Sequence, residues 1–219
     1  MTLPDPALRD DEIELPAGAV RLAGHLTVPE GASGIVAFAH GSGSSRHSPR
    51  NRYVAQVLRD AGLATLLFDL LDADEEADRA NVFAIDLLAE RLTAGLAWAR
   101  AQPECRPLPV GLFGASTGAA ATLWVAAEPG SQVEAVVSRG GRPDLAGPRL
   151  PSVRAATLLI VGGRDDVVLG LNEAAADRLT CEHRIAVVPG ATHLFEEPGT
   201  LEAAAELARD WFLAHLHPR

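Results

Sequence analysis

Short apolar segments alternate with longer segments of helical periodicity along almost the whole chain, and this alternation constrains the fold most strongly. Gly34–His40 and Leu63–Asp69 are continuous apolar runs, as expected for strands that are covered on both faces. Between them, the sequence predicts a helix over Tyr53–Ala61, which ends before Gly62. A strand–helix–strand order of this kind is typical of parallel strands that are joined by crossover helices.

The rest of the chain continues the same pattern, after an opening antiparallel pair that the turn residues Ala17-Gly18 connect. The predicted strands are Ile13–Leu15, Val20–Val28, Gly34–His40, Leu63–Asp69, Leu108–Phe113, Val133–Val137, Thr157–Val161 and Arg184–Val188. The predicted helices are Tyr53–Ala61, Val82–Gln102, Ala119–Glu128, Leu171–Leu179 and Leu201–Leu216. The sequence therefore predicts an α/β fold, with a mostly parallel sheet of about eight strands and helices on both faces.

No repeat or low-complexity linker divides the 219 residues, so we expect one domain over residues 1–219. A hydrophobic fraction of 47% and a charged fraction of 22% argue against disorder, and a net charge of -10 argues against a nucleic-acid partner. Met1–Pro16 lacks the basic and apolar regions of a signal peptide, and no apolar run is long enough for a membrane helix. We therefore expect a cytoplasmic protein that binds neither nucleic acid nor membrane. The sequence gives no indication of its oligomeric state.

The two cysteines, Cys105 and Cys181, have no metal-like spacing to each other or to a histidine. They also do not form the disulfide framework of a secreted domain, which favours a reducing compartment. The glycine-rich segments are not followed by the GK[ST] of a phosphate-binding loop. We therefore expect neither a metal nor a cofactor.

The segment Gly114-Ala115-Ser116-Thr117-Gly118 lies where a predicted strand ends and a helix begins. A side chain on such a tight turn has strained backbone angles, and glycines on both sides relieve the crowding between strand and helix. The helix beyond Ser116 also directs free backbone N–H groups toward a negative charge formed there. The motif predicts that Ser116 is a nucleophile. The alternative is a Gly/Ser-rich loop that only turns the chain.

A serine nucleophile needs a base, and the base needs an acid that orients it. Reacting groups in parallel sheets gather beyond the carboxyl ends of the strands, where Asp165 follows the seventh predicted strand and His193 follows the eighth. The chain order Ser116, Asp165, His193 is the order in which such sheets carry nucleophile, acid and base. We predict Asp165 as the acid and Asp166 as the cap of the next helix, although the sequence alone does not decide between the two aspartates.

The segment His40-Gly41-Ser42-Gly43-Ser44-Ser45 ends the first buried strand. A glycine-rich turn leaves backbone N–H groups able to approach a substrate oxygen, and we assign an oxyanion hole to the N–H groups of Ser42 and Thr117. The alternative is a flexible Ser/Gly loop. We interpret His40 as a residue that braces this loop and not as the general base.

These motifs together resemble the α/β-hydrolase superfamily, and more closely its dienelactone hydrolase-like branch. The matching segments are HGSGSSRHSPRN (His40–Asn51), GLFGASTGAAA (Gly111–Ala121), SRGGRPDLAG (Ser138–Gly147), LLIVGGRDD (Leu158–Asp166) and VPGATHLFEEPG (Val188–Gly199). The resemblance implies one α/β-hydrolase domain, a Ser116–His193–Asp165 triad and a carboxylic ester or related acyl substrate. Dienelactone hydrolases proper have a cysteine nucleophile, whereas this chain has serine at the matching position, which favours general esterase chemistry over the dienelactone substrate.

The connection after the sixth predicted strand is too short for a sizeable lid, so we expect an open, shallow cleft that suits small esters. Arg139 and Arg142 lie in this connection, at the edge of the sheet that also carries the predicted triad. They are candidate ligands for a substrate carboxylate or phosphate. The competing interpretation, which the sequence slightly favours, is that both pair with local acids such as Asp144.

We predict a serine carboxylesterase that hydrolyses small or short-chain carboxylic esters through an acyl-enzyme intermediate. One alternative is an acyltransferase, or a hydrolase of a lactone or other non-ester bond, because hydrolase folds host many chemistries. A less favoured alternative is a non-catalytic binding module with the same fold. Product analysis with a competing nucleophile separates transfer from hydrolysis, and covalent labelling by a fluorophosphonate separates an enzyme from a binding module.

Overall fold

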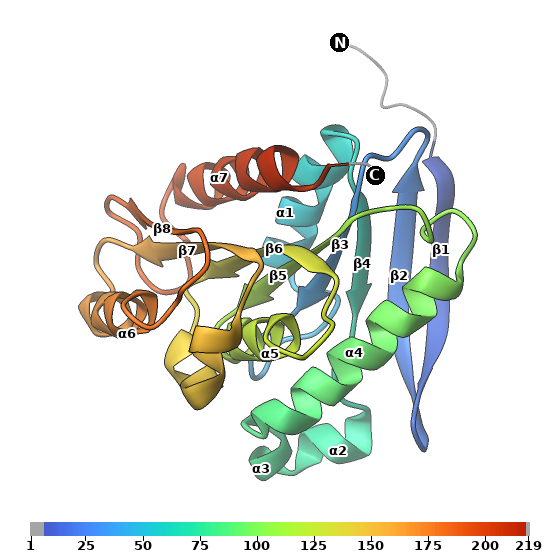
Figure 1. Cartoon of the computed structure of the whole chain (residues 1–219), viewed down its shortest axis with the longest axis horizontal. Coiled ribbons are helices and arrows are strands. Elements are labelled where there is room, and N and C mark those ends of the chain that lie inside the picture. The colour runs from blue at the N-terminus through green and yellow to red at the C-terminus, as the bar shows by residue number, and fades with distance from the viewer. Residues whose placement is uncertain (1–6, 218–219) are drawn as a thin grey trace.

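In the computed structural model, which describes residues 7–217, strands form the centre of the molecule and helices lie on both sides of them (Figure 1). Across the described residues, eight strands form one sheet in the order β1-β2-β4-β3-β5-β6-β7-β8. The strands are β1 (Ala7–Ala17), β2 (Val20–Pro29), β3 (Ile35–Ala39), β4 (Ala64–Phe68), β5 (Val110–Ala115), β6 (Val133–Arg139), β7 (Ala156–Gly162) and β8 (His183–Val188). Residues 1–6 and 218–219, which the predicted domain 1–219 includes, lie outside the described residues.

Helices cover both faces of this sheet, as the sequence predicts for an α/β fold (Figure 1). They are α1 (Pro49–Asp60), α2 (Ala73–Ala77), α3 (Arg79–Val82), α4 (Ile85–Ala101), α5 (Thr117–Ala126), the 3-10 helix η1 (Pro143–Ser152), α6 (Asp166–Ala176) and α7 (Thr200–His215). Leu58 of α1 and Phe212 of α7 are buried in the core on one face of the sheet. Leu92 of α4, Leu123 of α5 and Ala175 of α6 are buried in the core on the other face.

The strand directions agree with the sequence prediction. β1 pairs antiparallel with β2, β2 pairs antiparallel with β4, and all further neighbours are parallel. β1 begins well before the predicted start at Ile13, because polar residues such as Asp10 and Glu12 pair with β2 at the open edge of the sheet. The parallel arrangement brings the carboxyl ends of β3, β5, β6, β7 and β8 to one edge, where the predicted site residues lie.

Three helices next to the site begin earlier than the apolar periodicity predicts. α1 begins at Pro49, because proline fits the first helical position and the Ser48 hydroxyl accepts a hydrogen bond from the Asn51 N–H. α5 begins at Thr117, and its first turn contains small residues that carry little periodicity. α6 also begins earlier, at Asp166 rather than at the predicted Leu171.

Three short helices were not predicted. α2 begins with a capping box, in which Asp72 and Glu75 each accept a hydrogen bond from the backbone N–H of the other. Neither α2 nor α3 buries a residue, so neither shows an apolar period. η1 fills the connection between β6 and β7 and packs against α5 and α6. Within residues 7–217, every helix is too short or too polar to cross a membrane.

Candidate active site

Ser116 lies directly after β5 and directly before α5. Its φ of 50° and ψ of -122° are values that residues with a side chain rarely adopt. Although Ser116 occupies the N-cap position of α5, its side chain makes no capping hydrogen bond. The strained turn therefore presents a hydroxyl group that the helix does not use.

Gly114 and Gly118 let β5, β3 and α5 meet at this turn. A Cβ atom on Gly114 would lie 2.4 Å from the Cα atom of Ala119. A Cβ atom on Gly118 would lie 2.2 Å from the carbonyl oxygen of Ala39 at the end of β3. Because both distances are far below van der Waals contact, any larger residue would push the turn out of place. The two flanking glycines therefore have the steric role that the sequence motif predicts.

Asp165 and His193 are joined by a hydrogen bond of 2.7 Å, in which Nδ1 of the ring donates to Oδ2 of the carboxylate. Because a carboxylate only accepts, the ring proton is on Nδ1 and Nε2 is left as the basic nitrogen. Asp165 occupies the N-cap position of α6 without capping it, and Asp166 is the first residue of the helix. The prediction that Asp166 caps the helix is wrong, because Asp165 takes that position and turns its side chain to His193.

The loop that carries His193 is held by contacts within itself. Glu197 accepts hydrogen bonds from the Thr192 N–H at 3.0 Å and from the Thr192 hydroxyl at 2.7 Å. These bonds hold the pKa of Glu197 below its ordinary value, because they stabilise the carboxylate. Phe195 is buried and has a φ of 55°, so the loop folds its ring inward at the expense of backbone strain.

Ser116 and His193 line one cavity of about 280 Å³. The turn after β3, the start of α1 and the end of β6 complete its walls. Among the described residues, no hydrogen bond joins the Ser116 hydroxyl to His193, and such bonds often form only once a substrate is bound. The volume lies near the lower end of about 300–1,000 Å³ for small-molecule sites, so a compact ligand fits best.

The two N–H groups assigned to an oxyanion hole lie beside this turn, but one of them is engaged. The Ser42 N–H donates to the Thr117 hydroxyl oxygen at 3.1 Å. As the first residue of α5, Thr117 has a backbone N–H without a carbonyl partner inside the helix. The role of the Thr117 hydroxyl could not be predicted from the sequence, since its contact depends on how the turn after β3 folds against α5.

His40 braces the turn after β3, as the sequence analysis interprets it. Its Nδ1 donates to the Gly41 carbonyl oxygen at 3.1 Å, and its Nε2 accepts from the Leu70 N–H at 3.0 Å. Burial lowers the pKa of His40, although the Gly41 carbonyl and the nearby carboxylates of Asp69 and Glu76 act in the opposite direction. The ring is therefore neutral with both nitrogens in use, which leaves it unavailable as a base.

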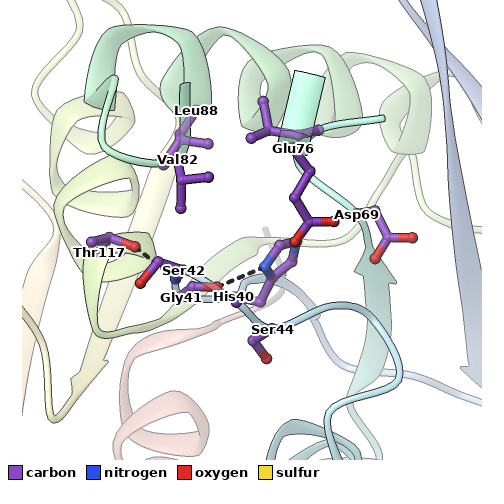
Figure 2. A pocket seen from close by; sticks show the side chains of 11 residues that line it. His40, Gly41, Ser42, Ser44, Asp69, Glu76, Val82, Leu88 and Thr117 are labelled. Atoms are coloured by element: carbon purple, nitrogen blue, oxygen red, sulfur yellow. Dashed lines mark hydrogen bonds between the residues drawn. The ribbon is translucent and has the colours of Figure 1, made fainter. Parts of the chain in front are cut away.

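A second and much smaller cavity, of about 20 Å³, lies on the other side of the turn (Figure 2). Figure 2 shows Thr117, Ser42 and His40 along its edge, with the Glu76 side chain directed toward His40. Gly41, Ser42 and Ser44 line both cavities. The turn after β3 is therefore the wall between the two cavities, and the hydrogen bond from Ser42 to Thr117 ties that wall to α5.

Arg139 and Arg142 have different surroundings. Two nitrogens of Arg142 donate to the two carboxylate oxygens of Asp144, each at 2.8 Å, and these bonds raise the pKa of Arg142. Arg142 thus makes the local pair that the sequence slightly favours. Arg139, the last residue of β6, instead lines the cavity of Ser116 and makes no ion pair within residues 7–217.

Comparison with known proteins finds a family that this chain matches over most of its length. The model of the dienelactone hydrolase family matches residues 22–217. The crystal structure of a dienelactone hydrolase from Anabaena variabilis is 54% identical, covers 95% of this chain and 99% of that chain, and superposes with a TM-score of 0.92. The esterase domain of a Rhodothermus marinus protein covers 95% of this chain and 99% of that chain with a TM-score of 0.76, but at 18% identity it shows the fold alone.

Longer proteins also match. Two curated Mycobacterium tuberculosis sequences, from two strains, carry the name "Putative phosphoribosyl transferase". Each is 65% identical to this chain over 212 residues, which is 97% of this chain and 48% of the relative. The chain therefore spans about half the length of these curated relatives, and their name describes the longer proteins.

Proposed function

Because this chain belongs to the dienelactone hydrolase family, we propose that it is a serine hydrolase that cleaves small or short-chain carboxylic esters. The observation that carries the proposal is the hydrogen bond between His193 and Asp165, beside the cavity that Ser116 also lines. The strained turn at Ser116 and the small volume of the cavity support it further. The name of the longer relatives does not decide the chemistry of this part, because it describes proteins about twice as long.

In the proposed mechanism, Ser116 Oγ attacks the ester carbonyl carbon while His193 Nε2 takes the hydroxyl proton. The Thr117 N–H stabilises the negative oxygen of the tetrahedral intermediate, together with the Ser42 N–H, which shares its proton between this oxygen and the Thr117 hydroxyl. The carbon–oxygen bond then breaks, the alcohol leaves with the proton from His193, and the acyl group stays on Ser116. His193 next takes a proton from water, whose oxygen attacks the acyl carbon. The bond between this carbon and Ser116 Oγ then breaks, His193 returns the proton to Ser116, and the acid leaves. Asp165 keeps the imidazole oriented and stabilises its cation in both steps.

The chain-length preference for p-nitrophenyl esters tests the proposed substrate class. A cavity of about 280 Å³ accepts short acyl chains, whereas longer chains extend into solvent without gaining contacts. We expect kcat/KM to be highest between acetate and butyrate and to fall at least about tenfold by octanoate. Release of p-nitrophenol across the series from acetate to palmitate measures this profile. An optimum at octanoate or beyond would contradict the small-ester proposal, and no turnover of any ester would contradict esterase activity.

The variants Thr117→Val and Thr117→Ser test the proposed oxyanion hole. Valine keeps the β-branched shape but removes the oxygen that accepts the Ser42 N–H, so the turn loses its tie to α5. Because a donor must be positioned before charge develops, we expect kcat to fall about tenfold in Thr117→Val and to stay within about twofold in Thr117→Ser. Steady-state hydrolysis of p-nitrophenyl butyrate measures both. An unchanged or higher kcat in Thr117→Val would show that the Thr117 hydroxyl only competes with the substrate oxygen for the Ser42 N–H.

A further inference from the structure

The connection that follows β6 holds the backbone of Ser116 from both sides. The Ser116 N–H donates to the Arg139 carbonyl oxygen at 3.4 Å, and the Arg142 N–H donates to the Ser116 carbonyl oxygen at 3.0 Å. A residue with the strained φ and ψ of Ser116 keeps them only where its surroundings hold it. The segment Arg139-Gly140-Gly141-Arg142, for which the proposed mechanism has no role, therefore supports the backbone of the proposed nucleophile.

Two glycines bring this segment close to both α5 and the loop that carries His193. A Cβ atom on Gly140 would lie 3.1 Å from the His193 carbonyl oxygen. A Cβ atom on Gly141 would lie 1.9 Å from Ser138 Oγ and 2.6 Å from the Cβ atom of Ala119 in α5. Because the last two distances are far below van der Waals contact, a larger residue at Gly141 would displace the segment.

Asn172 of α6 holds the second glycine in place. Its side chain is buried, and its Nδ2 donates to the Gly141 carbonyl oxygen at 3.0 Å and to the Val168 carbonyl oxygen at 2.8 Å. These two bonds use both protons of the amide. Its Oδ1 is buried without a hydrogen-bond partner within residues 7–217. An apolar side chain of similar size avoids the cost of this unpaired oxygen, so packing alone does not explain the amide.

One peptide group connects Asn172 to the proposed nucleophile. The carbonyl group of Gly141, which accepts from Asn172, and the N–H of Arg142, which donates to Ser116, belong to the same peptide. A peptide is planar and rigid, so fixing its carbonyl oxygen also fixes the direction of its N–H. A hydrogen bond to the carbonyl oxygen also polarises the peptide and makes its N–H a stronger donor. Two hydrogen bonds and one rigid group therefore lead from Asn172 to Ser116.

The same helix also carries the acid of the proposed triad. Asp165, the N-cap residue of α6, accepts a hydrogen bond from His193 at 2.7 Å. Asn172 follows seven residues later, which is about two helical turns, so the two side chains lie on the same side of α6. One rigid element thus holds the loop of His193 at its amino end and the turn at Ser116 two turns further along.

Resting on the proposed function, we propose that Asn172 is a positioning residue, which fixes the turn at Ser116 through the Gly141–Arg142 peptide and so sets the nucleophile relative to the base. Asn172 lies outside the wall of the cavity of Ser116. It therefore affects the rate at which bound substrate reacts and not the binding of the substrate. A shift of the nucleophile by about 1 Å is enough to slow the reaction about 100-fold.

Asn172→Leu tests this role, with Thr157→Val as the matched control. Both substitutions keep the approximate size of a buried side chain, and both remove a hydrogen bond to a backbone carbonyl oxygen. For Thr157 this oxygen belongs to Ala155 and lies 2.9 Å from the hydroxyl oxygen. Thr157 lies at the start of β7, at the end of the strand opposite the candidate site. The two variants therefore differ in whether the lost hydrogen bond leads to Ser116.

We expect the two variants to lose similar stability but different amounts of activity. Thermal unfolding should show that Tm falls by about 2–10 °C in both. Steady-state hydrolysis of p-nitrophenyl butyrate should show kcat about 10- to 100-fold lower in Asn172→Leu, with KM within about threefold of wild type, and kcat within about twofold in Thr157→Val. An unchanged kcat in Asn172→Leu, a change confined to its KM, or an equal loss of kcat in Thr157→Val would overturn the positioning role.

Asn172→Asp keeps the shape of the side chain and provides the test if Asn172→Leu does not fold. A protonated carboxyl group has one O–H that donates to the Gly141 carbonyl oxygen, whereas a carboxylate has none. Burial raises the pKa of the introduced carboxyl group above its ordinary value, so its proton is lost only as the pH rises. We expect the ratio of kcat between this variant and wild type to fall at least about tenfold between pH 6 and pH 9.

Taking this ratio at each pH removes the titration of His193, which both proteins share. A ratio that stays constant with pH, in a variant that circular dichroism shows to be folded, would contradict the positioning role. Failure of both variants to fold would show that Asn172 acts in folding instead of positioning.

Reaction with a fluorophosphonate separates this proposal from the proposed function. The reagent forms a bond between Ser116 Oγ and phosphorus with loss of fluoride, so its rate depends on the position of the hydroxyl group and not on an ester. We expect labelling to be about 10- to 100-fold slower in Asn172→Leu and within about twofold of wild type in Thr157→Val. Equal labelling rates in wild type and Asn172→Leu would overturn the positioning role alone. A wild type that is labelled but hydrolyses no ester would overturn the proposed function alone, and one that is neither active nor labelled would overturn both.

Discussion

Ser116→Ala is expected to lower kcat for short p-nitrophenyl esters by about four to six orders of magnitude. The substitution removes the only atom that forms the acyl-enzyme, whereas the cavity, the His193–Asp165 pair and the backbone N–H groups stay in place. The residual rate should therefore reflect binding and oxyanion stabilisation alone. Steady-state hydrolysis of p-nitrophenyl butyrate by both proteins measures the loss.

Ser44→Ala is the matched control for this experiment. Ser44 lines the same cavity, and its substitution by alanine removes the same hydroxyl group, but Ser44 takes no part in bond formation in the proposed mechanism. We expect its kcat to stay within about threefold of wild type. Equal activity of wild type and Ser116→Ala would contradict the acyl-enzyme mechanism. A loss of kcat in Ser44→Ala as large as that in Ser116→Ala would show that any disturbance of the cavity is sufficient to abolish activity.

The neighbouring aspartates provide the second large effect. Asp165→Asn should lower kcat by about 10⁴-fold, because an amide in place of the carboxylate can stabilise the wrong ring tautomer and cannot support the imidazolium charge. The kcat of Asp166→Asn should stay within about threefold of wild type, because Asp166 is exposed on the first turn of α6 and the hydrogen bond of His193 goes to Asp165. The same assay measures both variants.

The comparison is sharp because the two positions are adjacent in the chain and undergo the same chemical change. Similar losses in both variants would show that the effect comes from the start of α6 and not from the bond to His193. A loss of kcat in Asp166→Asn alone would show that Asp166, and not Asp165, is the acid that orients His193. Proton NMR of the His193 Nδ1–H gives a second readout, because this resonance depends on the partner that accepts the bond.

Much of the fold could be predicted because the sheet is covered on both faces. Burial on two sides gives β3 and β4 continuous apolar runs, which stand out from the helices around them. The turn of the opening hairpin and its second strand could also be predicted, but the polar first half of β1, before Ile13, could not. The short helices α2 and α3 could not be found in this way, since they bury no residue and depend on polar caps.

The candidate site could be predicted at positions where crowding restricts the type of residue. Gly114 and Gly118 are two such positions, since the crowding around Ser116 leaves no room for a side chain at either of them. Choosing between Asp165 and Asp166 needed the structure, because each can cap a helix or face a histidine. The structure was also needed to see that Arg139 has no acidic partner within residues 7–217. A missing partner is a property of the packed environment and leaves no pattern in the sequence.

Mass spectrometry of the protein after treatment with a fluorophosphonate tests the proposed nucleophile most directly. Such a reagent phosphonylates an activated serine, with loss of fluoride, and leaves a stable adduct. We expect one adduct per chain, located on the peptide that contains Ser116 and absent from both Ser116→Ala and His193→Ala. No adduct under conditions that label a known serine esterase, or an adduct on another residue that persists in Ser116→Ala, would contradict it.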